Sequence, residues 1–479
     1  MHTKRLMTAC LVLVFLGGFM HAQSKPTQTS PAQSKTAQAK RAQAKPAPMT
    51  EEQILARAWA VHQQAIPIDT HVDIPENWQQ DPGTWTTRKC DLIKMRAGGL
   101  RGVFMAVYEG QPRTPDHGLT PEGYQRVYDA AMAKFKAVHD LAEKMHPELC
   151  GLAVTPDQVE QIAKTGKRVV MIGVENGYPI GEDLSNVKKF YDLGARYITL
   201  SHSGHNQICD SSSDSTAPLH NGLSEFGKKV VAEMNRVGVM VDVSHIAPKS
   251  FWDVIAVTKA PIIASHSGCA AIAQSNRNLD DEQLKALAKN GGVIQVVALA
   301  SYLKNDSPER TAAIAKLREE LGMPAGGRGF GGGAGGGRGA GAGAPGGQRG
   351  GQAAQAGQRG QAPALTPEQQ AERDKQRAAY QERMKAIDAK YPPASLKDFV
   401  DHIDHAVKVA GIDHVGVGTD FDGGGGVPGF NDHGDAFNVT VELVRRGYSD
   451  LDIKKIWGGN LLRVWGQVQA IAAKSGRSN

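Results

Sequence analysis

Five short apolar runs in this chain each end on a histidine or an acidic side chain. A parallel strand that is buried on both faces reads as such a near-continuous Val/Ile-rich stretch. The polar ends of these runs can form one site only in a fold that brings the carboxyl ends of several strands to the same edge. The runs are AIPIDTHVD (65–73), VVMIGVEN (169–176), VMVDVSH (239–245), PIIASHS (261–267) and HVGVGTDFDG (414–423).

Eight strand candidates can be counted along the chain, and most are separated by stretches with helical periodicity. This alternation predicts a parallel α/β fold. Eight such units favour a closed (β/α)8 TIM-type barrel, whereas an open doubly wound sheet is the alternative that counting alone leaves standing. No G-x-G-x-x-G follows the first strand, which weakens a dinucleotide-binding interpretation. The predicted strands are 66–71, 101–107, 168–174, 196–201, 237–243, 261–265, 292–299 and 413–419.

The N-terminal region predicts export. Residues 1–22 combine Lys4 and Arg5 with a following apolar stretch, the pattern of a signal peptide, and a retained N-terminal anchor is the alternative. Residues 23–48 are rich in Ala, Gln, Lys and Pro and predict a disordered linker. The exported protein, with its barrel over residues 49–479, is expected to be periplasmic or secreted. No later segment is long and apolar enough to predict a membrane span.

The net charge of +6 does not indicate a nucleic-acid partner, because the excess positive charge lies outside the predicted barrel. The leader holds two basic residues, residues 23–50 hold five, and residues 323–365 hold four, with no acidic residue in either range. Without these eleven charges the rest of the chain carries −5. Four cysteines remain beyond the leader and could form two disulfides in an oxidising compartment, although their spacing predicts no particular pairing.

A low-complexity insertion is predicted after the seventh strand, over residues 304–395. Residues 323–362 are dominated by Gly, Ala, Arg and Gln, with too few apolar side chains to offset the entropy of ordering them. Polar stretches at 307–321 and 366–390 flank this segment and are expected to be helical. The insertion therefore interrupts the barrel, and the barrel domain itself runs from 49 to 479.

The polar residues at the strand ends are of the types that bind metals. His71 and Asp73 are two apart on a strand, so both side chains lie on one face. Glu175 can offer one carboxylate oxygen to each of two metals. His245 and His266 close two neighbouring strands, and imidazole and carboxylate donors together suit zinc. The alternatives are a turn aspartate with a surface histidine, a capping glutamate, and histidines that are hydrogen-bonded in the core.

Three further residues are candidates for catalysis or substrate binding. Asp420 could transfer a proton beside metal-activated water, or could itself be a ligand. His202 ends the run YITLSHS (197–203) and is expected to hydrogen-bond the substrate. Arg277, in SNRN, suits a bidentate grip on a carboxylate, and a surface salt bridge is the alternative.

At these residues the chain resembles the membrane dipeptidase (renal dipeptidase) family of zinc metallopeptidases. The resemblance covers about residues 60–465, apart from the insertion. Several motifs occur in order over this length, which makes a chance match improbable. They are DTHVD, GVENG, ITLSHS, GLSEFGKKVVAEMNRVGVMVDVSH, IIASHSG, SNRN, DFDGGGG and GGNLLRVW.

The resemblance implies a (β/α)8 barrel that binds two zinc ions and hydrolyses dipeptides. It assigns His71 and Asp73 to one zinc, His245 and His266 to the other, and Glu175 as the bridge. It implies that Asp420 is the acid/base, that His202 faces the substrate and stabilises the developing oxyanion, and that Arg277 binds the substrate carboxylate. Tyr302 falls where the family places a substrate-side tyrosine. A homodimer is an expectation from the resemblance alone.

The expected activity is hydrolysis of L-Xaa-L/D-Xaa dipeptides by a hydroxide that two metal ions activate. Another amidohydrolase-type barrel, acting on N-acyl amino acids, lactams or phosphoesters, is the second hypothesis. A third is a non-catalytic binding protein on the same scaffold. The presence of every expected ligand and of Asp420 favours an enzyme.

Overall fold

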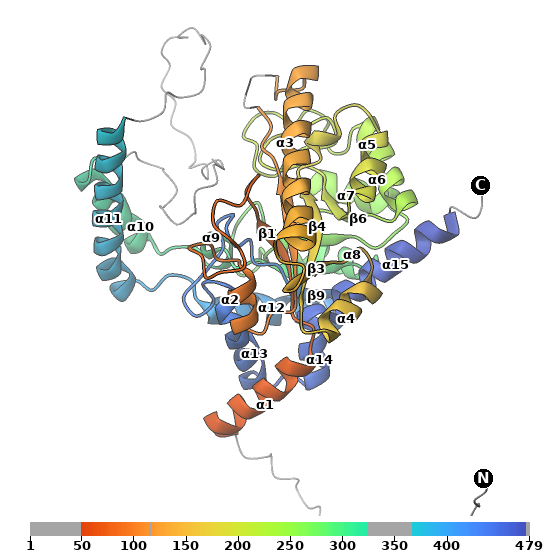
Figure 1. Ribbon diagram of the computed structural model, residues 1–479. Helices are drawn as coiled ribbons and strands as arrows, with labels where there is room; N and C mark the ends of the chain where they lie inside the picture. The colour runs from red at the N-terminus through yellow and green to blue at the C-terminus, as the bar shows by residue number, and fades with distance from the viewer. Residues whose placement is uncertain (1–48, 113, 115, 324–365, 476–479) are drawn as a thin grey trace, which may run out of the picture. The chain divides into compact units, whose positions relative to one another are not determined.

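The computed structural model describes residues 49–112, 114, 116–323 and 366–475. The predicted leader and linker, and nearly all of the low-complexity segment, lie outside these residues. The described residues from 49 onward form one compact unit, with strands at its centre and helices around them (Figure 1). None of the helices in the described ranges combines the length and apolar character needed to cross a bilayer.

Eight parallel strands form a nearly closed barrel, which confirms the predicted (β/α)8 fold. Each of the eight overlaps a strand predicted from the sequence, and neighbours in the barrel follow one another in chain order. A parallel bridge between Val72 and Phe421 joins the last strand to the first. The strands are β1 (Ile68–Asp73), β2 (Gly102–Tyr108), β4 (Arg168–Glu175), β5 (Ala195–Thr199), β6 (Met240–Asp242), β7 (Ile263–Ser267), β8 (Val293–Val296) and β9 (Val415–Val417).

One short strand was not predicted. β3 (Cys150–Leu152) pairs in parallel with β4 but lies off the path of the barrel. Its three residues, Cys-Gly-Leu, are too few to show a periodic pattern, and glycine is a poor strand former. Its pairing depends on the neighbouring β4 and could not be seen locally.

The helices begin and end at residues whose side chains explain the boundaries. Thr50, the N-cap of the first helix, forms a capping box with Gln53. Ser224 caps α6 (Glu225–Val237), and Gly238 ends it in the left-handed conformation that glycine adopts without strain. The buried face of α6 carries Val230, Val231 and Met234, so the helix packs inward and leads directly into β6.

The helices are α1 (Glu51–Gln64), α2 (Leu92–Ala97), α3 (Pro121–Asp140), α4 (Pro156–Lys164), α5 (Ser185–Asp192), α6 (Glu225–Val237), α7 (Pro248–Val257), α8 (Asp281–Lys289), α9 (Ala300–Leu303), α10 (Pro308–Glu320), α11 (Pro367–Lys390), α12 (Leu396–Ala410), α13 (Ala436–Arg445), α14 (Asp450–Lys454) and α15 (Asn460–Ser475). Between β8 and β9 the chain forms α10 and α11, at the two stretches predicted to be helical. The buried Arg310 of α10 ties the pair together through Asp388 of α11, with 2.8 Å between Nη1 and Oδ1.

The four described cysteines are buried and unpaired, so the two disulfides that export would allow are not formed. Burial raises the pKa of the Cys150, Cys209 and Cys269 thiols to about 12. These side chains therefore pack as small apolar groups, and their thiolates are suppressed at neutral pH.

His62 is expected to make the fold sensitive to acid. Burial lowers its pKa to about 4 in the folded chain, against 6.5 unfolded. Its ring contacts Thr440 Oγ1, 2.6 Å from Nδ1, and the Gly98 carbonyl, 2.9 Å from Nε2, and the carbonyl offsets only part of the effect of burial on the pKa. The unfolded chain binds the proton first as pH falls from 6.5 to 4, so up to about 3 kcal/mol of stability is lost over that window.

Urea unfolding of the wild type and of His62→Gln at pH 7 and pH 4.5 would measure this effect. Both proteins will lose stability from other titrating groups, and the wild type is expected to lose more. Equal losses in the two proteins would contradict the assignment of the acid sensitivity to His62.

Candidate metal centre

The predicted metal ligands all lie at the carboxyl-terminal end of the barrel. His71 and Asp73 are in β1, Glu175 is the last residue of β4, and His266 lies near the end of β7. His245 follows β6 by three residues. Four of the five are buried and Asp73 is half-buried. Parallel strands that all run toward this end bring together residues that lie up to 195 positions apart in the chain.

Glu175 is the centre of this cluster, because its two carboxylate oxygens face different histidines. Oε2 lies 3.3 Å from His71 Nε2, and Asp73 Oδ1 lies 3.7 Å from that same nitrogen. Oε1 lies 3.0 Å from His245 Nε2 and 3.4 Å from His266 Nε2. The Glu175 carboxylate therefore lies between His71 and Asp73 on one side and the nitrogens of His245 and His266 on the other.

His202 is as close to Glu175 as the predicted ligands are. Its Nε2 lies 3.5 Å from Oε1, and its ring centroid lies 4.1 Å from that of His245. Potential ligand atoms form two sets, and within each set all atoms lie within 4.8 Å of one another. One set comes from His71, Glu175 and His266, and the other from Glu175, His202 and His245. This grouping differs from the assignment implied by the resemblance, which pairs His245 with His266 and gives His202 to the substrate.

The electrostatics of the cluster favour a bound cation. Burial lowers the pKa of His245 and of His266 well below the usual value, so both imidazoles are neutral and keep a lone pair. Burial opposes ionisation of Glu175, yet its neighbours, led by His71, hold its pKa well below the usual range. Burial also lowers the pKa of His71, but Tyr197, Glu175 and Asp73 together raise it well above 6.5. The surroundings of His71 thus stabilise positive charge.

The donor set fits a metal ion. His71 Nε2 and Asp73 Oδ1 are buried atoms without a hydrogen-bond partner among the described residues, and leaving such atoms unpaired is costly unless a ligand meets them. Two nitrogens on one tetrahedral zinc, at about 2.0–2.1 Å each, would lie about 3.3 Å apart. The 3.3 Å between His71 Nε2 and Glu175 Oε2 equals that spacing, and the 2.8 Å between His245 Nε2 and His266 Nε2 is shorter.

The backbone is strained at the ends of the strands that carry the cluster. Asn176, His245, Asp420 and Asp422 adopt positive φ angles of 73°, 70°, 59° and 64°. Such angles in residues other than glycine cost of order 1–3 kcal/mol each and persist only where the surrounding structure holds them. The Asp420 amide donates to the His71 carbonyl at 3.0 Å, which is one such restraint.

Asp420 lies beside Asp73 at the edge of the cluster. A Cβ atom on Gly423 would stand 2.2 Å from Asp420 Oδ1 and 2.9 Å from Asp73 Oδ2, so both carboxylates reach this place only because residue 423 is glycine. Burial raises the pKa of Asp420 well above its usual value, and Asp73 and Glu175 add to the shift. Asp422 instead accepts the amides of Lys89 and Cys90, as expected of a structural turn residue.

Arg277 is buried rather than on the surface, which overturns the alternative of a surface salt bridge. It is 4% exposed. Nη2 donates to the His266 carbonyl at 3.3 Å, and Nε has no hydrogen-bond partner within the described ranges. No ion pair to Arg277 occurs among the described side chains, whereas a buried guanidinium usually has one. Tyr302, in α9, lies beside it, with its ring centroid 5.5 Å from Arg277 Cζ.

Four neighbouring residues were missed by the sequence reasoning. Tyr197 Oη lies 2.8 Å from His71 Nδ1, and Tyr108 Oη lies 3.2 Å from His202 Nδ1. The fully buried carboxylates of Asp69 and Asp242 accept backbone amides next to the cluster. An acidic residue inside an apolar strand, as in IDTH and VMVD, was the available signal for the two aspartates.

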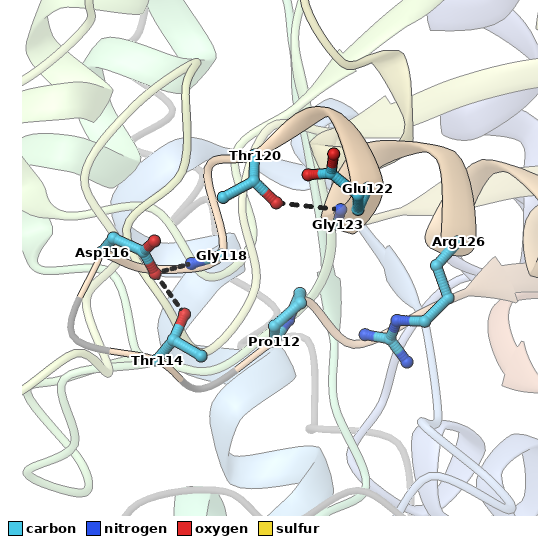
Figure 2. Close-up of a pocket in the computed structure, with 8 residues that line it drawn as sticks. All are labelled: Pro112, Thr114, Asp116, Gly118, Thr120, Glu122, Gly123 and Arg126. Carbon is cyan, nitrogen blue, oxygen red and sulfur yellow. Dashed lines mark hydrogen bonds between the residues drawn. The ribbon is translucent and has the colours of Figure 1, made fainter. Parts of the chain in front are cut away.

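A separate surface pocket of about 250 Å³ lies between the loop after β2 and the start of α3 (Figure 2). Thr120 Oγ1 accepts the Gly123 amide there at 3.1 Å, and Asp116 accepts the Gly118 amide at 3.1 Å. None of the clustered histidines or carboxylates lines it, so this pocket is not the metal centre.

Comparison with known proteins agrees with the geometry. The model of the membrane dipeptidase family (peptidase family M19) matches residues 55–479. The dipeptidase verJ of Clonostachys rogersoniana is 28% identical over 386 residues, which cover 80% of this chain and 77% of that protein. The dipeptidase tcpJ of Claviceps purpurea is 27% identical over 387 residues, covering 80% and 70%.

Solved structures give the same result. The probable dipeptidase PvdM of Pseudomonas aeruginosa has a TM-score of 0.69 and 30% identity, covering 88% of this chain and all of that one. A metallopeptidase of Rhodobacter sphaeroides, solved with a phosphinate mimic of L-Ala-D-Ala, shares the fold, with a TM-score of 0.58, 20% identity, and coverage of 84% and 99%. The resemblance seen in the motifs is confirmed, and the chain belongs to the membrane dipeptidase family, peptidase family M19.

Proposed function

We propose that this chain is a zinc-dependent dipeptidase with two metal ions, which hydrolyses L-Xaa-L/D-Xaa dipeptides. The observation that carries the proposal is the division of the Glu175 oxygens between His71 on one side and His245 and His266 on the other. His71 and Asp73 would hold one zinc, His245 and His266 the other, and Glu175 both. When bound, the two ions would activate water and polarise the scissile carbonyl.

Arg277 would select substrates with a free carboxylate. Its guanidinium is buried, lacks an anionic partner in the described part of the chain, and has a free Nε. A substrate carboxylate would supply the missing charge through charge-assisted hydrogen bonds. In a dipeptide that carboxylate lies one residue beyond the scissile bond, so an arginine this close to the metal ligands favours short substrates. Tyr302 packs beside the guanidinium and would line the same part of the site.

His202 would stabilise the negative charge that develops on the carbonyl oxygen, and Asp420 would transfer protons. Burial lowers the pKa of His202, so its neutral imidazole has one N–H to donate to the carbonyl oxygen as negative charge develops. Asp420 lies beside Asp73 and has a raised pKa, which suits a carboxyl that holds a proton for part of the cycle. Asp420 would take a proton from the attacking water and pass it to the leaving amine.

A dipeptide panel tests this function against the amidohydrolase alternative. The purified protein would be assayed on L-Ala-D-Ala and Gly-D-Ala, and on N-acetyl amino acids, before and after chelation and zinc return. Dipeptide hydrolysis that is lost with the chelator and restored by zinc is expected. Zinc-dependent turnover of the N-acetyl amino acids alone would favour the other amidohydrolase activity, and turnover of neither despite bound zinc would favour a binding role.

Replacing Arg277 by Ala is expected to lower kcat/KM for dipeptides by about 10- to 150-fold, the equivalent of about 1.5–3 kcal/mol for a hydrogen bond to a charged group. The matched control is the same dipeptide with an amidated C-terminus, which offers no carboxylate and should lose little further activity in the variant. An equal loss on both substrates would mean that Arg277 supports the fold of the site and does not bind the carboxylate.

A further inference from the structure

Two buried hydroxyl groups stand behind two of the histidines, on the side of each ring away from Glu175. Tyr197 Oη lies 2.8 Å from His71 Nδ1, and Ser265 Oγ lies 2.9 Å from His266 Nδ1. Both rings direct Nε2 toward the Glu175 carboxylate. The hydroxyl contacts therefore determine which nitrogen of each ring carries the proton.

The proton of the Tyr197 hydroxyl is committed to a carbonyl. Oη lies 3.1 Å from the backbone oxygen of Thr70, which can only accept. The arrangement that satisfies every group has Oη–H donating to Thr70 and the Oη lone pair accepting Nδ1–H from His71. If Oη–H donated to His71 Nδ1 instead, no proton would lie between Tyr197 Oη and the Thr70 carbonyl oxygen, and this buried contact would not be a hydrogen bond. His71 thus keeps its proton on Nδ1 and presents Nε2 to the centre.

Ser265 is committed in the same way, to a carboxylate. Its Oγ donates to Asp242 Oδ2 at 2.6 Å, and Asp242 also accepts the amides of Ser244 and Ser265 at 3.0 and 2.8 Å. The 2.6 Å distance is short, as expected of a hydroxyl that donates to a carboxylate oxygen, so the Ser265 hydroxyl proton points toward Asp242. The Oγ lone pair is left to accept Nδ1–H from His266, which frees Nε2.

His245 provides the contrast within the same cluster. Its Nδ1 is buried and has no hydrogen-bond partner in the part of the chain that the structure describes, so no described hydroxyl orients that ring. The two supported rings lie on opposite oxygens of Glu175, His71 on Oε2 and His266 on Oε1. Each half of the centre therefore contains one imidazole whose tautomer is set by a hydroxyl.

We propose that Tyr197, and Ser265 together with Asp242, are positioning residues that set the metal-binding tautomers of His71 and His266. This inference rests on the metal centre of the proposed function. Partners of this kind behind a metal-binding imidazole typically change metal affinity by about 10- to 100-fold. Each hydroxyl is thus expected to control the affinity of one of the two metal ions.

The test is zinc titration of the full chain against a chromophoric chelator. Tyr197→Phe and Ser265→Ala are each expected to lower the affinity for one of the two zinc ions by about 10- to 100-fold. Ser265→Thr, which keeps a hydroxyl, should bind zinc with the wild-type affinity. The matched controls are Tyr178→Phe and Ser250→Ala, since each removes a buried hydroxyl that donates only to a backbone carbonyl. Both controls should keep the wild-type affinities.

Two results would contradict the inference and still be compatible with the proposed function. One is a wild type that binds two zinc ions while both variants bind them equally well. The other comes from ¹⁵N NMR of histidine-labelled, metal-free wild type, in which His266 would carry its proton on Nε2. The NMR measurement needs no variant to fold and no metal to bind. If the wild type bound no zinc, that result would instead contradict the proposed function.

Discussion

Replacing Glu175 by Gln is expected to remove most of the activity and to lower the zinc content below two per chain. The carboxamide keeps the size of the side chain but replaces one oxygen, and the negative charge, with an NH₂ group that cannot bind a metal. Partners behind metal ligands already change affinity or activity by about 10- to 100-fold, so losing a shared ligand should lower kcat/KM by at least about 100-fold.

Metal analysis and dipeptide kinetics on the same preparation would check this result. Glu143→Gln is a suitable control, because Glu143 also faces a histidine, His139 Nδ1 at 2.7 Å, but on the exposed surface. Two tightly bound zinc ions and near-normal turnover in Glu175→Gln would show that Glu175 does not join the two halves of the centre.

Replacing Asp420 by Asn is expected to lower kcat by about 10²- to 10⁴-fold, the usual range for losing a general acid or base. Asparagine has nearly the same shape and cannot accept the proton from water. Zinc content should stay at two per chain if Asp420 moves protons only. A loss of zinc would instead make Asp420 a ligand, the alternative that the sequence left open.

The kinetics and zinc content of Asp432→Asn provide the matched control. Asp432 follows Asp420 by twelve residues, and its carboxylate accepts the Gly434 amide. It makes none of the contacts described for the metal centre. Unchanged kcat in Asp420→Asn, with dipeptide hydrolysis intact in the control, would remove Asp420 from the proton path.

The strands of the barrel could be predicted because most of them lie in short runs rich in Val and Ile. Buried parallel strands require that composition, and the pattern is local. β3 could not be predicted, because its three residues form a strand only by pairing with β4. The helices at 308–320 and 367–390 were predicted from composition, and their junction depends on Arg310 and Asp388, which lie 78 residues apart.

The sequence by itself determined which residues end the strands, and therefore which ligands could meet once the strands run side by side. His71, Glu175, His245 and His266 follow from position alone, because every parallel strand points its end to the same face of a barrel. Only the tertiary structure decided the rest. Arg277 reads as an ordinary surface cation until the fold buries it. Tyr197 reads as a core aromatic until the curvature of the barrel brings β5, which pairs with β4 and β6, across from β1 and places its hydroxyl behind His71. Proton positions and charge pairing depend on contacts between distant segments, which no local pattern of residues records.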